Sequence, residues 1–143
     1  MFENLRSRKF CRIAIEIMRF ALALVFLWFG LLKLFNVSPV LDVIAISFPA
    51  IAENQILYLL LAILEIAIGI GIFLPRIQRF FLWVLIGHLL AATIGVLTSG
   101  YAFASNFPLL TFTGEFVIKN IVLMAAALVL ISYDRKFYLD ESA

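Results

Sequence analysis

Charged residues are scarce in this sequence, and no polar domain separates its hydrophobic stretches. Only 14% of the residues are charged, whereas 65% are hydrophobic. A water-soluble fold could not hide that much apolar surface from water. The net charge of +2 is too small to indicate a nucleic-acid-binding surface, and the basic residues gather at the ends of apolar segments. We therefore expect a single helical membrane domain over residues 1–143.

Cysteine and histidine are almost absent as well. Because Cys11 is the one cysteine, the chain cannot form an intramolecular disulfide or a redox-active CxxC pair. Cys11 lies just before the first apolar segment, and we interpret it as an interfacial residue, with acylation as the alternative. The one histidine, His88, cannot by itself build a zinc site or ligate a haem on both faces. The sequence therefore predicts no metal site.

Four apolar segments are long enough to cross a bilayer. At about 1.5 Å per helical residue, roughly 20 residues span a hydrocarbon core of about 30 Å. The predicted spans are residues 13–35, 56–74, 80–98 and 110–133. No small-x-small cleavage site follows the first segment, so we expect it to be retained rather than removed as a signal peptide. The sequence thus predicts an all-α protein, an integral membrane four-helix bundle.

Lysine and arginine are distributed unevenly beside these spans. The amino-terminal arm carries four, the turn at 75–79 carries two and the carboxy-terminal tail carries two, whereas residues 36–55 and 99–114 carry none. By the positive-inside rule, this bias predicts that both termini and the turn are cytoplasmic. In the first outer segment, Ser38 followed by Pro39 predicts the start of a short interfacial helix, with Ser38 as the N-cap.

Ionisable residues inside the spans carry the most information, since each costs on the order of 2 to 3 kcal/mol at the bilayer centre and must face protein or water. They are Arg19, Lys33, Glu65, His88, Glu115 and Lys119. Intervals of three and four residues place them on small-residue stripes that we expect to face the bundle interior. The stripes are Arg19-Ala23-Phe26-Gly30-Lys33, Glu65-Gly69, Val84-His88-Ala91-Gly95-Thr98 and Glu115-Lys119-Val122-Ala126-Val129-Tyr133.

By depth, Lys33, Glu65, His88, Glu115 and Lys119 are expected to converge on one pocket in the outer half of the bilayer, as candidates for ligand binding or proton relay. Most have a structural alternative. Glu115 and Lys119 are spaced for an intrahelical ion pair, Lys33 could snorkel to the outer surface, and His88 could simply bond a neighbouring helix. Glu65 has no partner on its own helix, which makes it the strongest functional candidate.

Two further polar residues are expected to be structural. Arg19 lies nearer the cytoplasmic end, three residues from Glu16. Asn120 lies in the fourth span, where an amide is expected to hydrogen-bond across to another helix.

Three ordered motifs resemble those of DoxX-type membrane proteins. Residues 19–34 combine an Arg, an apolar stretch and a Gly-x-x-Lys-hydrophobic ending. Residues 64–69 resemble the Glu-x-x-x-Gly of the second DoxX helix, and residues 119–128 resemble the basic-polar start and alanine-rich body of the fourth. The stretch 107–115, which opens with Phe107-Pro108, is closer to the YkgB-like branch of inner-membrane proteins associated with reactive-chlorine resistance.

The resemblance implies a multi-pass protein of the bacterial inner membrane, since some relatives are membrane subunits of quinone-reducing thiosulfate oxidoreductases or of redox-stress complexes. It implies a subunit that binds a small hydrophobic or quinone-like ligand within the bundle, with the lipid bilayer, a redox subunit or a second copy as partners. The chain has no catalytic motif of its own, so an enzymatic role would rest on analogy. A small-molecule or ion transporter and a non-catalytic scaffold remain the alternatives.

Overall fold

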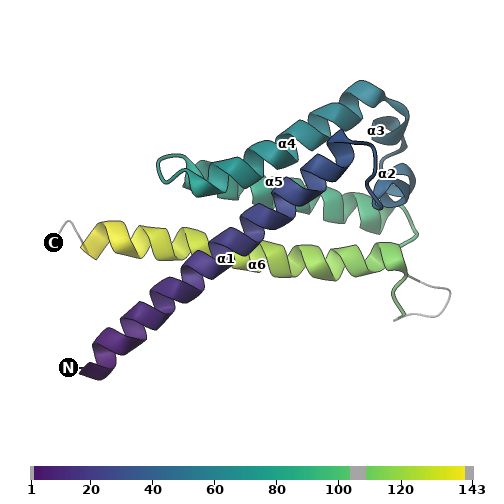
Figure 1. Ribbon diagram of the computed structural model, residues 1–143. Helices are drawn as coiled ribbons and strands as arrows, with labels where there is room; N and C mark the ends of the chain where they lie inside the picture. Colours follow the sequence, from purple (N-terminus) through teal and green to yellow (C-terminus); the bar gives the residue numbers. More distant parts are fainter. Residues whose placement is uncertain (1, 104–108, 141–143) are drawn as a thin grey trace.

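A computed structural model describes residues 2–103 and 109–140, with side chains described between 9 and 133 outside the gap. Within those residues the chain is helical apart from turns and one isolated β-bridge, Phe103 to Leu110. The helices are α1 (Phe2–Leu34), α2 (Leu41–Ser47), α3 (Pro49–Glu53), α4 (Gln55–Phe73), α5 (Gln78–Thr98) and α6 (Phe112–Asp140). Figure 1 shows their arrangement.

Four of these helices are long and apolar enough to cross a membrane. Their spanning parts are Lys9–Leu34, Gln55–Phe73, Gln78–Thr98 and Phe112–Tyr133. The predicted all-α architecture is therefore confirmed, and four helices have the length and apolar character of the predicted spans, with boundaries that shift by a few residues. The start of α1, the end of α6 and the α4–α5 turn lie at one end of the bundle, and α2 and α3 lie at the other (Figure 1). We call the latter the α2–α3 end.

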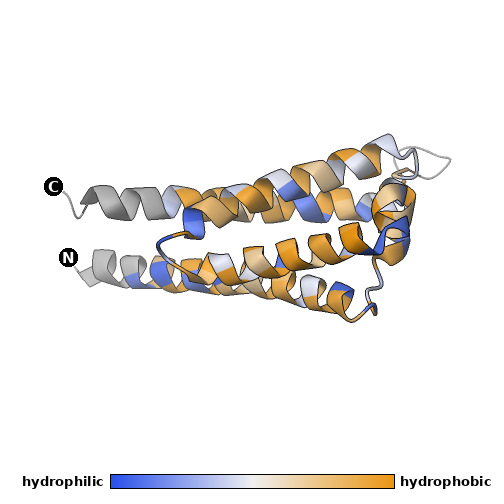
Figure 2. Cartoon of the chain, turned by 90° about the horizontal axis from the view of Figure 1, so that it is seen from above, coloured by the Kyte–Doolittle hydropathy of each residue, from blue (hydrophilic) through white to orange (hydrophobic). Residues whose placement is uncertain are grey.

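The long helices form two pairs, in which α1 packs most extensively against α4 and α5 against α6. Seen from above, hydrophobic residues cover the middle of each long helix (Figure 2). Glycines permit the α1–α4 contact. A Cβ added to Gly30 would lie 2.9 Å from the carbonyl oxygen of Ala62, and one added to Gly69 would lie 2.9 Å from the backbone nitrogen of Leu27. Small residues at these positions therefore set the helix spacing, as in other membrane bundles.

The main cluster of buried hydrophobic side chains lies in the half of the bundle away from α2 and α3. Its fully buried large side chains come from α4, α5 and α6, namely Ile68, Ile72, Leu82, Leu85 and Leu130. Large apolar side chains also cover the outside, where Trp28 is 58% and Trp83 is 54% exposed. In water such a surface would be costly, but lipid tails cover it without loss.

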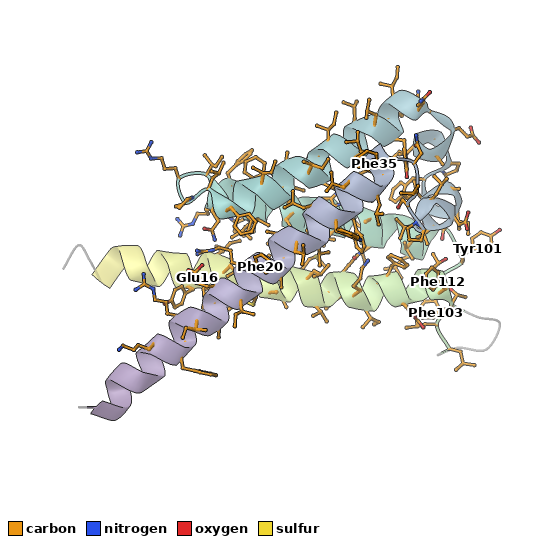
Figure 3. The ribbon with its side chains drawn as sticks, in the orientation of Figure 1. Glu16, Phe20, Phe35, Tyr101, Phe103 and Phe112 are labelled. Atoms are coloured by element: carbon orange, nitrogen blue, oxygen red, sulfur yellow. The ribbon has the colours of Figure 1, made fainter. Side chains whose placement is uncertain are left out.

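Aromatic side chains gather where the bundle ends beside α2 and α3. Tyr101, Phe103 and Phe112 lie together there (Figure 3), and all three are exposed. Amphipathic aromatic rings favour the boundary between lipid and water, so this end fits a membrane interface. The Phe107-Pro108 dipeptide, which opens the stretch that resembles the YkgB-like branch, lies outside the described residues.

The predicted start of the short helix in the 36–55 segment is wrong. Helix α2 begins at Leu41, its N-cap position is Val40, and no side chain caps it. Instead, the backbone turns so that the amide of Leu41 bonds the carbonyl of Ser38 at 3.3 Å, which buries Val40 and Val43 in apolar clusters. Burial of these valines outweighs the capping preference of Ser38, which is worth only about 1 kcal/mol. A helix-starting proline does occur, but it is Pro49 of α3.

The predicted inward stripe of the fourth span is correct only in part, because Lys119, Ala126 and Tyr133 are half-buried while the other members are exposed. Val122 is 62% and Val129 is 49% exposed. The buried face of α6 is instead formed by Thr113, Gly114, Asn120, Ala127 and Leu130. The stripe of α5 is correct only in part, because Gly95 is buried while Ala91 and Thr98 are exposed. By contrast, Ala23, Phe26, Gly30 and Lys33 of α1 are all buried, as are Glu65 and Gly69 of α4.

Candidate functional site

A buried ion pair joins the last turn of α1 to the middle of α4. The Nζ atom of Lys33 lies 2.6 Å from Oε2 and 2.9 Å from Oε1 of Glu65. The two side chains are only 3% and 7% exposed. Removing both charges from water costs several kcal/mol per ion, so short contacts of this kind are needed for the pair to be tolerated. Lys33 therefore does not snorkel to the surface, and Glu65 finds on α1 the partner that its own helix lacks.

Histidine 88 brings a third helix to the same carboxylate. Its Nε2 atom lies 3.5 Å from Oε1 of Glu65, a long contact that a small movement would turn into a hydrogen bond. The imidazole also meets the ring of Phe26 edge-on, with 6.0 Å between ring centroids. Helices α1, α4 and α5 thus meet at Glu65, and the imidazole beside its carboxylate has one ring nitrogen that can donate and one that can accept a hydrogen bond.

A cavity of about 190 Å³ lies beside this cluster, with walls from α1 to α6. Most of the lining is aliphatic or aromatic. The polar exceptions are Lys33, Ser47, Glu65, His88, Lys119 and Asn120. Apolar walls with a few convergent polar groups are typical of small-molecule sites. An apolar cavity of about 150 Å³ in a protein core can hold a benzene molecule, so this space suits a ligand with one or two rings.

Lysine 119 reaches the cavity from α6. It is half-buried, and its Nζ atom lies 3.9 Å from the ring centroid of Phe116 and 4.8 Å from that of Phe29. Both aromatic rings also line the cavity. A cation over aromatic faces gains on the order of 1 kcal/mol. These ring contacts give the ammonium no oxygen acceptor for its N–H groups.

Glutamate 115 does not join the site. Its side chain is exposed, and it is absent from the described cavity lining. The predicted ion pair with Lys119 is also not formed, because the Lys119 ammonium lies against Phe116 and Phe29. The rotation of α6 that buries Asn120 directs residue 115 outward. The structure thus gathers four of the five predicted site residues around one cavity and leaves out Glu115.

The two residues predicted to be structural make local and interhelical bonds. Arg19 bonds both carboxylate oxygens of Glu16 at 3.0 Å, away from the cavity. The amide nitrogen of Asn120 donates to the hydroxyl of Thr93 on α5 at 3.3 Å, which confirms the predicted contact across helices. Asn120 also lines the cavity, a position that its spacing in the sequence did not indicate.

Aromatic walls were the part of the site that the sequence did not predict. Phe48, at the α2–α3 junction, lies over Gly95 of α5 so closely that any Cβ at Gly95 would overlap its ring. The Phe48 ring lines the cavity with Phe29 and Phe116. The glycine was a usable signal, because it indicated a close approach at that point of α5. Its partner is a ring from a connecting segment rather than another spanning helix.

No protein-family model, no curated protein and no solved structure matches this chain.

Proposed function

We propose that this protein is a multi-pass protein of the bacterial inner membrane that binds one small, ring-shaped, quinone-like molecule between its helices. In this proposal it serves as a membrane subunit in redox or oxidative-stress chemistry. One observation carries the proposal: a cavity of about 190 Å³ with aromatic walls, in which Lys33, Glu65, His88 and Lys119 meet. The resemblance of its motifs to DoxX-type proteins supports the same function.

The lining matches the chemistry of such a ligand. Quinone carbonyl oxygens accept hydrogen bonds, and the ammonium groups of Lys33 and Lys119 and the ring N–H of His88 are donors. The flat faces of Phe29 and Phe116 suit a planar ring. A quinone that is reduced also takes up protons, and the 3.5 Å contact between His88 and Glu65 provides groups that can deliver them. Electrons would come from a partner subunit.

Orientation is part of the proposal. With both termini cytoplasmic, as the distribution of lysine and arginine favours, the α2–α3 end faces the periplasm. The cavity is lined by residues of α2 and by the halves of the long helices next to it, so it would lie in the outer leaflet. A ligand dissolved in the hydrocarbon region of the outer leaflet could then reach the cavity without passing to the cytoplasmic side.

A non-catalytic scaffold is the second candidate, because the Lys33–Glu65 pair also ties α1 to α4. The test is to purify wild type, Glu65→Gln and the control Glu115→Gln in mild detergent, extract each, and measure co-purifying quinones by mass spectrometry beside thermal stability. We expect a specific quinone in wild type and in Glu115→Gln, and its loss from folded Glu65→Gln. If wild type contains no specific ligand and Glu65→Gln only lowers stability, the scaffold replaces the redox subunit.

A further inference from the structure

The charges around the cavity do not cancel. Lys33 and Glu65 neutralise each other at 2.6 Å, which leaves the ammonium of Lys119. Within the described side chains, no carboxylate lies within ion-pair distance of Lys119. Glu115, one turn away on the same helix, is exposed and absent from the cavity lining. The cavity therefore carries one positive charge in excess when His88 is neutral.

Aromatic contacts position this charge without using up its donors. The Lys119 ammonium lies against the rings of Phe116 and Phe29, 3.9 Å and 4.8 Å from their centroids. Such contacts attract the cation through the ring face, but an ammonium has three N–H donors that seek oxygen acceptors. The residue lies seven positions from the start of α6, about 10 Å along the helix axis. At that depth in a membrane, few water molecules are available to replace an acceptor.

We infer that the ligand is an acid, an apolar ring that carries a phenolate, enolate or carboxylate group, and that Lys119 binds this anionic group. The inference rests on the proposed function, namely that the cavity holds a ring-shaped ligand. A neutral quinone would leave the Lys119 charge uncompensated, whereas an anion would complete an ion pair of the kind that Lys33 and Glu65 already form. Attraction between opposite charges is also stronger in this low-dielectric surrounding than in water.

Two sources could supply such an anion, a lipophilic ring acid or the headgroup of an anionic phospholipid. The cavity favours the ring acid. Its volume of about 190 Å³ and its aromatic walls suit a compact planar molecule, whereas a phospholipid headgroup is strongly hydrated and is tied to two long acyl chains. Lys119 is therefore assigned as the residue that selects acidic over neutral ring compounds.

The experiment uses the full chain in nanodiscs of zwitterionic phosphatidylcholine and two probes of nearly equal shape. One is lawsone, a hydroxylated naphthoquinone that is an anion at neutral pH, and the other is its uncharged methyl ether. Affinities are measured by isothermal titration calorimetry for wild type, Lys119→Met and Lys119→Arg. The methionine keeps the apolar stem of the lysine and removes its charge, while the arginine keeps the charge.

A charge-assisted hydrogen bond predicts that wild type binds lawsone at least about tenfold more tightly than the ether. Lys119→Met should lose this preference, because it weakens lawsone binding more than ether binding, and Lys119→Arg should keep it. Equal binding of both probes by wild type, with no effect of Lys119→Met, overturns the inference and leaves the proposed function intact. Failure of wild type to bind either probe overturns both.

A second arm separates the two sources of the anion. The titrations of wild type and of Lys119→Met are repeated in nanodiscs that contain phosphatidylglycerol. If the ring acid is the ligand, wild type should still prefer lawsone to the ether. The anionic lipid repels the lawsone anion, and this should weaken lawsone binding to wild type and to Lys119→Met by the same factor. If phosphatidylglycerol abolishes lawsone binding to wild type while the ether still binds, Lys119 holds a lipid headgroup and the assignment to a ring acid is wrong.

Discussion

Replacing Glu65 by Gln is the most direct test of the buried ion pair. The substitution keeps the shape of the side chain and removes its negative charge, which leaves the ammonium of Lys33, itself 3% exposed, without a counterion. Breaking a buried pair by removing one partner costs about 3 to 5 kcal/mol in proteins generally. The glutamine oxygen can still accept one of the two bonds now made at 2.6 Å and 2.9 Å, which recovers about 1 kcal/mol.

The net penalty is therefore the cost of the unpaired charge less the energy of the recovered bond. A lost neutral hydrogen bond between membrane helices would instead cost about 0.6 kcal/mol on average. We expect Glu65→Gln to lower the free energy of unfolding by about 2 to 4 kcal/mol. Lys33→Met should cost less, because the imidazole of His88 still lies 3.5 Å from the Glu65 carboxylate and can donate a hydrogen bond to it.

The assay is reversible unfolding of the purified protein in mixed micelles, followed by circular dichroism, with Glu115→Gln as a control for the same chemical change at an exposed position. The control should stay within about 0.5 kcal/mol of wild type. In the double variant Lys33→Met with Glu65→Gln, much of the loss should be restored, since no charge is left unpaired. An unchanged stability of Glu65→Gln, or simple additivity in the double variant, would refute the reasoning.

Two further predictions concern packing and topology. Gly30→Leu should destabilise the bundle by about 1 to 3 kcal/mol, because even its Cβ would lie 2.9 Å from a backbone oxygen of α4. Ala21→Leu on the exposed face of α1 should change stability little, and equal tolerance at both sites in the unfolding assay would contradict this packing. For topology, reporters fused after Arg79 and after Ala143 should read cytoplasmic and one inserted at residues 99–106 should read periplasmic. A cytoplasmic signal from that loop would exclude the proposed orientation.

How much of the site could be predicted from sequence differs between residues. Lys33, Glu65, His88 and Lys119 were identified because an ionisable side chain in an apolar span has few tolerable surroundings. Their pairing was not predictable. Lys33 and Glu65 are 32 residues apart, and only the packing of α1 on α4 decides that they meet. Glu115 has the same local signal, yet the rotation of α6 turns it away from the cavity.

By itself, the sequence determined the four spans, because in lipid each backbone polar group must be bonded within its own segment, so apolar length alone indicates a helix. Tertiary structure decided which way each helix faces. Lipid tails are as apolar as a protein core, so the pattern of valine, leucine and alanine on α6 could not show that Val122 is exposed and Ala127 is buried. Phe48 over Gly95 and the cavity beside it likewise exist only once connecting segments fold back onto the bundle.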